Sequence, residues 1–221
     1  MWLFTPGLTL MDLVMRLFAI LMVVFLILPL HECAHGWVAY RLGDNTAKVT
    51  GRLTLNPLVH FDPLGAIGVL LFSFGWARPV PVDASNFRKP RRDMALVAAA
   101  GPLSNLLAAI IGGLIVNFID LLHFGVAQIW IDTFFSYYIS LNIGIAVFNL
   151  IPLAPLDGFR IVEAFIPERF LISYYKHYHM ITLVVFLLLL FGILSVPLVF
   201  LESLVYGLVM KITALPFALF M

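Results

Sequence analysis

Charged residues are scarce in this sequence: Asp, Glu, Lys and Arg make up 11% of its 221 residues, whereas 62% are hydrophobic. Soluble domains carry about 25% charged residues, so the composition excludes an ordinary soluble domain. The net charge is only +1 and no basic tract is interleaved with aromatic residues, which argues against binding of nucleic acid. We therefore expect an integral membrane protein, surrounded by the lipid bilayer.

Cysteine is almost absent as well. The one cysteine, Cys33, excludes a disulfide bond within the chain, and a small apolar filler is its simplest role. The first residues lack the basic region and the small-residue cleavage site of a signal peptide, so we expect the first apolar run to remain in the protein.

Long apolar stretches alternate with short polar loops, and this pattern predicts an all-α polytopic membrane protein. We expect about five to six transmembrane or membrane-embedded helices in a single domain over residues 1–221. Its core would cover about residues 8–165, followed by C-terminal helices at about residues 166–221. The expected spans are residues 8–41, 94–122, 134–156, 180–200 and 204–221, with a short re-entrant segment at residues 65–76.

Residues 46–55 differ from the apolar stretches. They alternate polar and apolar side chains, include β-branched residues, and contain Gly51 near the middle. Asn56 and Pro57 then interrupt the pattern. This arrangement predicts a short β-strand or β-hairpin after the first span.

Positive charge is distributed unevenly along the chain. Eight of the thirteen Lys and Arg residues lie between Arg41 and Arg92, three lie between Arg160 and Lys176, and none lies in residues 94–159. By the positive-inside rule, the first two groups are cytoplasmic and the loop at residues 120–132 is outside. We expect the N-terminus outside, in the cell membrane of a prokaryote.

The sequence HECAH, from His31 to His35, stands at the end of the first long apolar run. Positions i and i+4 share one face of a helix, so both histidines can bind one metal ion. Glu32 projects from the neighbouring face, where it can take a proton from a water that the metal activates. Polar groups inside an apolar helix are costly, which favours a functional role over chance.

A catalytic zinc site has three protein ligands and a water, so a third protein ligand is needed besides the two histidines. Asp157 is the best candidate, because it follows the third expected span at its cytoplasmic end, next to Gly158. An ordinary helix-terminal Asp is the simpler alternative. His123 lies on the opposite side of the membrane. Surface positions explain the other cytoplasmic candidates, which are His60, Asp62, His177 and His179.

Four pieces of the sequence resemble the site-2 protease family of intramembrane zinc metalloproteases: HECAH, GRLTLNPLVHFDPLG, AGPLSN and FNLIPLAPLDG. They occur in the family's order over about residues 20–165. The resemblance implies one zinc ion per chain, held by His31, His35 and Asp157, with Glu32 as the general base. No stretch corresponds to the PDZ insert or the regulatory nucleotide-binding module of some relatives.

The resemblance also implies that Asn149 holds the substrate backbone or the developing oxyanion. Asn105 of AGPLSN is a second residue of this kind in the family. Helix packing through its small neighbours explains Asn105 about equally well.

The activity implied by the resemblance is hydrolysis of peptide bonds within or next to transmembrane segments of membrane-anchored proteins, toward the cytoplasmic leaflet. Such a substrate must unwind, and residues 46–55 could pair with it by β-augmentation, although a purely structural hairpin is an equal alternative. Two other functions use the same residues. A metal-binding or transport protein would need polar groups across both leaflets, which are nearly absent from the outer half. An inactive helix-binding pseudoprotease would have no use for Glu32.

Overall fold

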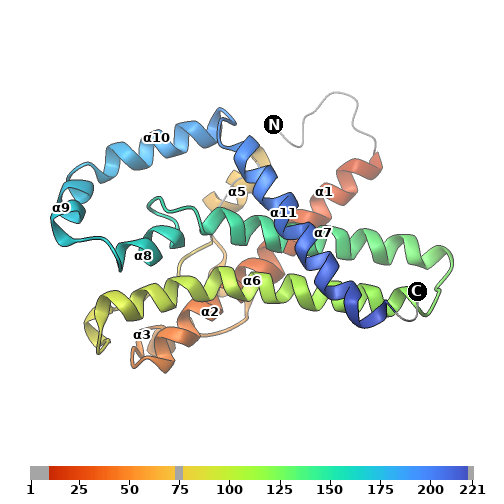
Figure 1. Cartoon of the computed structure of the whole chain (residues 1–221), viewed down its shortest axis with the longest axis horizontal. Helices are drawn as coiled ribbons and strands as arrows, with labels where there is room; N and C mark the ends of the chain where they lie inside the picture. Colours follow the sequence, from red (N-terminus) through yellow and green to blue (C-terminus); the bar gives the residue numbers. More distant parts are fainter. Residues whose placement is uncertain (1–9, 73–76, 219–221) are drawn as a thin grey trace.

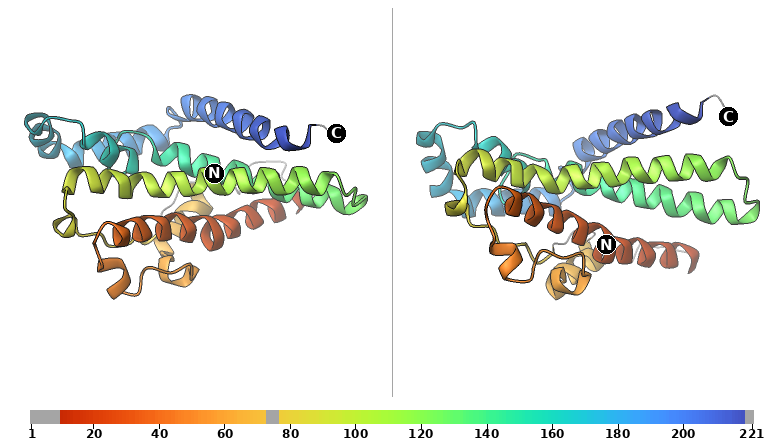
Figure 2. Two further views of the ribbon diagram at one scale, coloured as in Figure 1. Left: turned by 60° about the horizontal axis from the view of Figure 1, so that its bottom comes forward. Right: turned by 90° about the horizontal axis from the view of Figure 1, so that it is seen from below.

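The computed structural model of the chain describes residues 10–72 and 77–218, and every regular element in these ranges is helical (Figure 1). Two long antiparallel helices, α6 (Pro90–Asp120) and α7 (Val126–Asn149), run side by side along the molecule. The N-terminal helices lie along one side of α6, and α11 (Ser195–Ala214) crosses α6 and α7 on the other side (Figure 2).

Short helices form the connections and the C-terminal arm. They are α3 (Thr46–Val49), α4 (Pro57–His60), α5 (Pro63–Phe72), η3 (Ala84–Asn86), α8 (Asp157–Glu163), α9 (Glu168–Lys176), α10 (Tyr178–Leu190) and η4 (Leu215–Phe217). Of the predicted re-entrant segment, residues 65–72 belong to α5, while residues 73–76 lie outside the described residues.

Four helical segments of the described chain are long and apolar enough to cross a membrane: Leu13–Arg41, Pro90–Asp120, Val126–Asn149 and Ser195–Phe217. The pair α9 and α10, bent by 70°, makes a fifth if it is counted as one broken span. The prediction of an all-helical integral membrane protein is thus confirmed. The described residues contain four candidate spans, or five with the bent pair, compared with the five to six transmembrane or membrane-embedded helices expected.

The first span is helical from Leu10 to Arg41 but changes its winding before the histidine motif. It consists of α1 (Leu10–Met22), a π-helical turn η2 (Val23–Ile27) and α2 (Leu28–Arg41). Pro29 has no N–H, and its ring would collide with the carbonyl four residues earlier in a regular α-helix. The wider turn accommodates this proline, and it sets the direction in which α2 presents its side chains.

The β-hairpin predicted for residues 46–55 is wrong. Residues 46–49 form α3, and turns follow until Asn56 caps α4 by accepting a hydrogen bond from the N–H of Leu58 at 3.1 Å. Asp44 explains the helix, because its Oδ1 accepts hydrogen bonds from both the N–H and the hydroxyl of Thr46. These local hydrogen bonds at the start of α3 outweigh the β-propensity of the alternating pattern.

The two C-terminal spans predicted at residues 180–200 and 204–221 are also placed wrongly. The helix α10 ends at Leu190, and Gly192 adopts a left-handed conformation with φ of +71°. Such a glycine ends a helix without steric cost. Pro197 then stands in the first turn of α11, where its missing N–H costs little, so α11 begins at Ser195.

The main apolar core lies where α6, α7 and α11 meet. Its buried members are Ala109, Val116, Ile139, Ile143, Val147 and Val209. Small residues allow the close approach, since a Cβ atom added to Gly113 would lie 2.7 Å from the hydroxyl of Thr213 on α11. The amide of Asn117 donates to that hydroxyl at 3.2 Å, which satisfies two polar groups at membrane depth.

Asp44 holds the polar segments together at the end of α2. Its side chain is fully buried, and besides Thr46 it accepts hydrogen bonds from the N–H of Asp83 and the amide of Asn86, both at 2.8 Å. Burial alone would raise the pKa of the Asp44 carboxyl, but the hydrogen bonds from Thr46, Asp83 and Asn86 lower it below its ordinary value. The charged carboxylate therefore ties α2 and α3 to the loop that precedes α6.

Replacing Asp44 by Asn should destabilise the protein by about 1–3 kcal/mol, because buried donors then lose a charged acceptor. A carboxyl with a lowered folded-state pKa stabilises the fold above its unfolded pKa of about 3.9, and this stabilisation is lost as pH falls through the folded value. Thermal unfolding in detergent should show a difference from the parent protein that is constant from neutral pH to about 5 and shrinks below about 4. Asn45→Ala, at an exposed neighbour without a capping hydrogen bond, is the control. Equal stability of Asp44→Asn and Asn45→Ala at neutral pH would contradict the assignment.

Candidate metal centre

Three potential ligands from two distant parts of the chain meet beside α6. His31 and His35 point from α2, and Asp157 is the first residue of α8. The two Nε2 atoms are 3.0 Å apart, and Asp157 Oδ2 lies 3.1 Å from His31 Nε2 and 3.2 Å from His35 Nε2. Ligand atoms of a tetrahedral zinc site with bonds of about 2.0–2.2 Å are separated by about 3.3–3.6 Å. The three atoms are therefore only slightly closer together than on one face of such a site.

The protonation of the histidines supports this interpretation. His35 Nδ1 lies 2.7 Å from the carbonyl oxygen of Val97 on α6, and a carbonyl can only accept, so Nδ1 carries the proton. The form of His35 that binds a metal ion is neutral, and with Nδ1 protonated it directs the lone pair of Nε2 at His31 and Asp157. In that form at least two electron-pair donors converge at this point, an arrangement that a cation between them stabilises.

Gly101 makes this arrangement sterically possible. A Cβ atom at this position of α6 would lie 2.4 Å from His35 Nε2 and 2.6 Å from His31 Nε2. Both histidines are nearly buried, with exposed fractions of 4% for His31 and 8% for His35. The glycine therefore provides the space in which the two imidazoles and an ion can fit against α6. The sequence motif AGPLSN contains Gly101, but nothing in its pattern indicated this role.

The loop before α8 is tightly folded and brings Asp157 to the histidines. A Cβ atom on Gly158 would lie 2.2 Å from the carbonyl oxygen of Leu150, so the backbone segments are in direct contact. Tyr174 on α9 accepts a hydrogen bond from the N–H of Ala154 at 3.1 Å, and its ring stacks on Phe159 at 4.4 Å. These contacts from α9 brace the loop, which the sequence had not indicated.

The electrostatic state of Asp157 suits a metal ligand. Burial would raise the pKa of its carboxyl, but the hydrogen bonds with His31 and His35 lower this pKa to about 2. The carboxylate is therefore charged at neutral pH, and metal ions bind that form.

Glu32 lies beside these residues but outside the group of three. Its Oε2 accepts a hydrogen bond of 2.9 Å from the N–H of Val80, while Oε1 makes no hydrogen bond to the part of the chain that the structure describes. One oxygen of the carboxylate is thus anchored, and the other is available for a water.

The two asparagines predicted for the site are placed differently from one another. Asn149, the last residue of α7, donates its amide to the carbonyl of Ile145 in its own helix at 3.0 Å. Asn105 follows Gly101 by one helical turn on the same face of α6, and it is fully buried with its Nδ2 unpaired.

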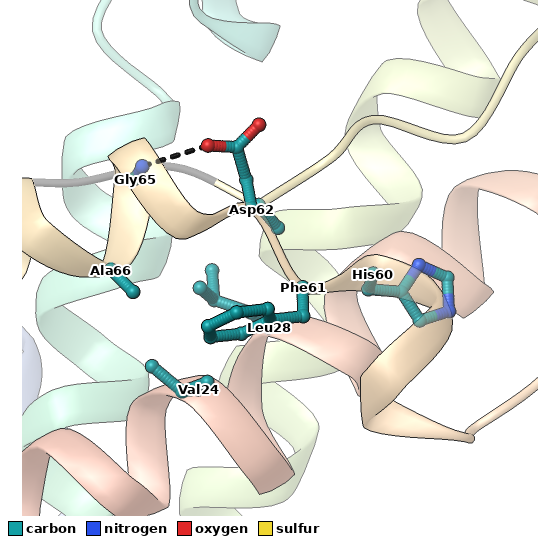
Figure 3. Close-up of a pocket in the computed structure, with 8 residues that line it drawn as sticks. Val24, Leu28, His60, Phe61, Asp62, Gly65 and Ala66 are labelled. Atoms are coloured by element: carbon teal, nitrogen blue, oxygen red, sulfur yellow. Dashed lines mark hydrogen bonds between the residues drawn. The ribbon is translucent and has the colours of Figure 1, made fainter.

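The remaining candidates do not join the group. His60, expected at the surface, is 1% exposed and pairs through Nε2 with the carbonyl of Thr54 at 2.8 Å. Asp62 accepts a hydrogen bond from the N–H of Gly65 at the start of α5 (Figure 3). The adjoining cavity of about 10 Å³ is close to the size of a single water, and Val24 and Leu28 line its other side. His123 and His177 pair with carbonyls of Leu121 and Ser173.

Comparison with known proteins agrees with this geometry. Residues 18–193 match the model of "Peptidase family M50". The chain belongs to this family, which is the site-2 protease family. The resemblance seen in the sequence is therefore confirmed, and with it the general class of membrane-embedded metallopeptidases.

Similar curated proteins are bacterial. The chain is 49% identical over 144 residues to "Putative zinc metalloprotease YwhC" of Bacillus subtilis (strain 168), covering 62% of this chain and 64% of that protein. It is 34% identical over 142 residues to "Putative zinc metalloprotease Rip2" of Mycolicibacterium smegmatis, covering 62% and 52%. The chain thus matches between half and two thirds of the length of these relatives. No solved structure matches it significantly.

We expect Gly101→Ala to weaken zinc binding about 10- to 100-fold, because the new methyl group displaces the imidazoles from their common point. Zinc content after dialysis against graded chelator, and the visible spectrum of the cobalt-substituted protein, measure this effect. Gly207→Ala is the matched control, since a Cβ atom there meets nothing within 4 Å. Equal zinc affinity of the two variants would show that Gly101 does not shape the centre.

Proposed function

We propose that this protein is an intramembrane zinc metalloprotease that hydrolyses peptide bonds within or next to transmembrane segments of membrane-anchored proteins. The observation that carries the proposal is the convergence of His31, His35 and Asp157 in the second half of an apolar span, with Glu32 beside them. These three residues would hold one zinc ion per chain. Bound zinc would supply a Lewis acid that polarises a carbonyl and lowers the pKa of water to about 7.

Glu32 is the general base in this proposal. Its anchored Oε2 leaves Oε1 to take a proton from the attacking water, and the same carboxyl then passes that proton to the leaving amine. A metal site with a purely structural role needs no such base, and closed structural sites use four protein ligands.

The substrate would be a transmembrane helix that unwinds near the site, since a helix hides its scissile carbonyl in its own hydrogen bonds. Asn149 would donate its amide to the oxyanion or the substrate backbone, after leaving the carbonyl of Ile145. Asn105, with a buried amide lacking a partner, is a second candidate donor. Because residues 46–49 are helical, the strand that was one of two alternatives for residues 46–55 is not available to pair with substrate.

The proposed location is the cell membrane of a bacterium, with the site toward the cytoplasmic leaflet. The basic residues Arg88, Lys89, Arg91 and Arg92 immediately before and at the start of α6 support a cytoplasmic position for that end of the molecule. The histidines lie in α2, which ends at Arg41 and packs against α6. The bacterial origin of the relatives supports the rest of the assignment.

The test uses protein reconstituted in liposomes with a panel of single-span reporters. Each carries a fluorophore and a quencher on either side of a transmembrane helix, interrupted by Gly and Asn near its cytoplasmic end. Cleavage of at least one reporter that depends on zinc supports the proposal. Zinc flux into the liposomes without cleavage of any reporter would instead indicate a transport protein.

Glu32→Gln should keep its zinc and its melting temperature but lose at least about 10²-fold in kcat, because the amide cannot accept the proton. The rate of reporter cleavage, together with metal analysis of the same sample, checks both parts. Cys33→Ser, at the adjacent partly buried position of α2, is the control and should cleave normally. Activity of Glu32→Gln within tenfold of the parent protein would remove Glu32 from the mechanism.

Asn149→Ala should lower kcat by about 10²- to 10³-fold if its amide binds the oxyanion. Reporter cleavage over a range of reporter concentrations separates kcat from KM. An increase in KM alone would make Asn149 a residue that positions substrate, and unchanged kinetics would exclude both roles.

A further inference from the structure

Arg52 binds backbone carbonyls from two different segments of the chain. Its Nη1 donates to the carbonyl of Val59 in α4, and its Nη2 donates to the carbonyls of Arg78 at 2.9 Å and Pro79 at 3.0 Å. A planar guanidinium presents its donors in a fixed fork, which suits several acceptors at once. Arg52 thus joins α4 to the extended residues 77–83.

A second contact strengthens the same junction. The N–H of Arg78 donates to the carbonyl of His60 at 2.8 Å, and His60 is itself buried and paired with the carbonyl of Thr54. The backbone at Arg78 is therefore held from both sides, by an acceptor on α4 and by the guanidinium of Arg52.

Residues 77–83 connect these contacts to Glu32. Pro79 and Pro81 have no N–H, so Val80 carries the one backbone donor among these three residues. That donor binds Glu32 Oε2 at 2.9 Å. The side chain of Val80 is buried against α2, where a Cβ atom on Gly36 would lie 3.1 Å from its Cγ1.

This arrangement has a consequence for catalysis. A glutamate side chain has three rotatable bonds, and a base must present one oxygen to the water in a narrow range of positions. A displacement of about 1 Å can cost about 10²-fold in rate. The Val80 N–H selects one orientation of the carboxylate, and its own position depends on Arg52.

We propose that Arg52 is a positioning residue for Glu32: it fixes the carbonyls of Arg78 and Pro79 and thereby holds the Val80 N–H on the carboxylate of the base. Arg52 itself touches neither the metal ligands nor the substrate in this account. The inference rests on the proposed function, in which Glu32 is the general base.

The first experiment measures hydrogen exchange of the Val80 amide in the reconstituted protein, which needs no substrate. Because Pro79 and Pro81 have no amide hydrogen and the first residue of a peptide carries a free amine, a peptide of residues 78–81 reports the Val80 amide alone. Exchange should accelerate at least about tenfold in Arg52→Gln and in Arg52→Lys, since neither side chain can bind all three carbonyls. Arg78→Gln is the matched control, because Arg78 takes part through its backbone while its side chain is exposed. Exchange that is equally slow in both Arg52 variants and the control would overturn the inference.

The second experiment measures cleavage of the reporter that the parent protein cuts best. Both Arg52 variants should lose about 10- to 100-fold in kcat, with KM and zinc content unchanged and Arg78→Gln equal to the parent. Unchanged kcat, or a change in KM alone, would overturn the inference. If Arg52→Gln does not accumulate in folded form, Arg52→Lys decides, since it keeps the charge and the alkyl chain. The exchange result stands even if no reporter is cleaved, so a failure of the proposed function is distinguishable from a failure of this inference.

Discussion

The ligand atoms of two imidazoles and a carboxylate lie within 3.2 Å of one another beside α6, in the second half of a predominantly apolar span. Bringing such groups together at membrane depth is costly unless a cation satisfies their lone pairs. Three features of the surrounding structure make this arrangement possible. The π-helical turn at Val23–Ile27 accommodates Pro29 before the motif, Gly101 leaves room for the imidazoles, and the folded loop before Gly158 delivers Asp157.

A second group of polar contacts lies beyond the membrane-spanning part, and it positions the carboxylate of Glu32, which lies next to the metal ligands. Asp44 ties α3 and the loop before α6 to the end of α2, while Arg52 and His60 hold the extended residues 77–83. Through Val80 this group of contacts reaches Glu32. The ligands are thus held by packing against α6, whereas the base is held by backbone hydrogen bonds from a loop. Substitutions in the two groups of contacts should therefore separate metal binding from proton transfer.

The sequence predicted the parts of the site that depend on local geometry. The i, i+4 spacing places His31 and His35 on one face whatever surrounds them, and long apolar runs identify the spans. Asp157 lies 126 residues from His31, and its place after the third expected span made it the best candidate for the third ligand. The resemblance to a family then favoured this role over that of an ordinary helix-terminal Asp. The prediction of a hairpin at residues 46–55 failed because Asp44 accepts local hydrogen bonds from Thr46 at the start of α3, and no alternation pattern shows these bonds. The C-terminal boundaries failed because hydropathy is continuous there, and only the left-handed Gly192 and the position of Pro197 divide the helices. The contacts of Gly101, Tyr174 and Val80 arise from the packing of distant segments and have no sequence signature of their own.

The central claim is that His31, His35 and Asp157 hold one zinc ion. The most direct measurement is a crystal structure of the purified protein with diffraction data collected on both sides of the zinc absorption edge. The account predicts one anomalous difference peak per chain, about 2.0–2.2 Å from His31 Nε2, His35 Nε2 and a carboxylate oxygen of Asp157. A zinc peak bound to other residues, or a protein saturated with zinc that shows no peak between these three side chains, would contradict it.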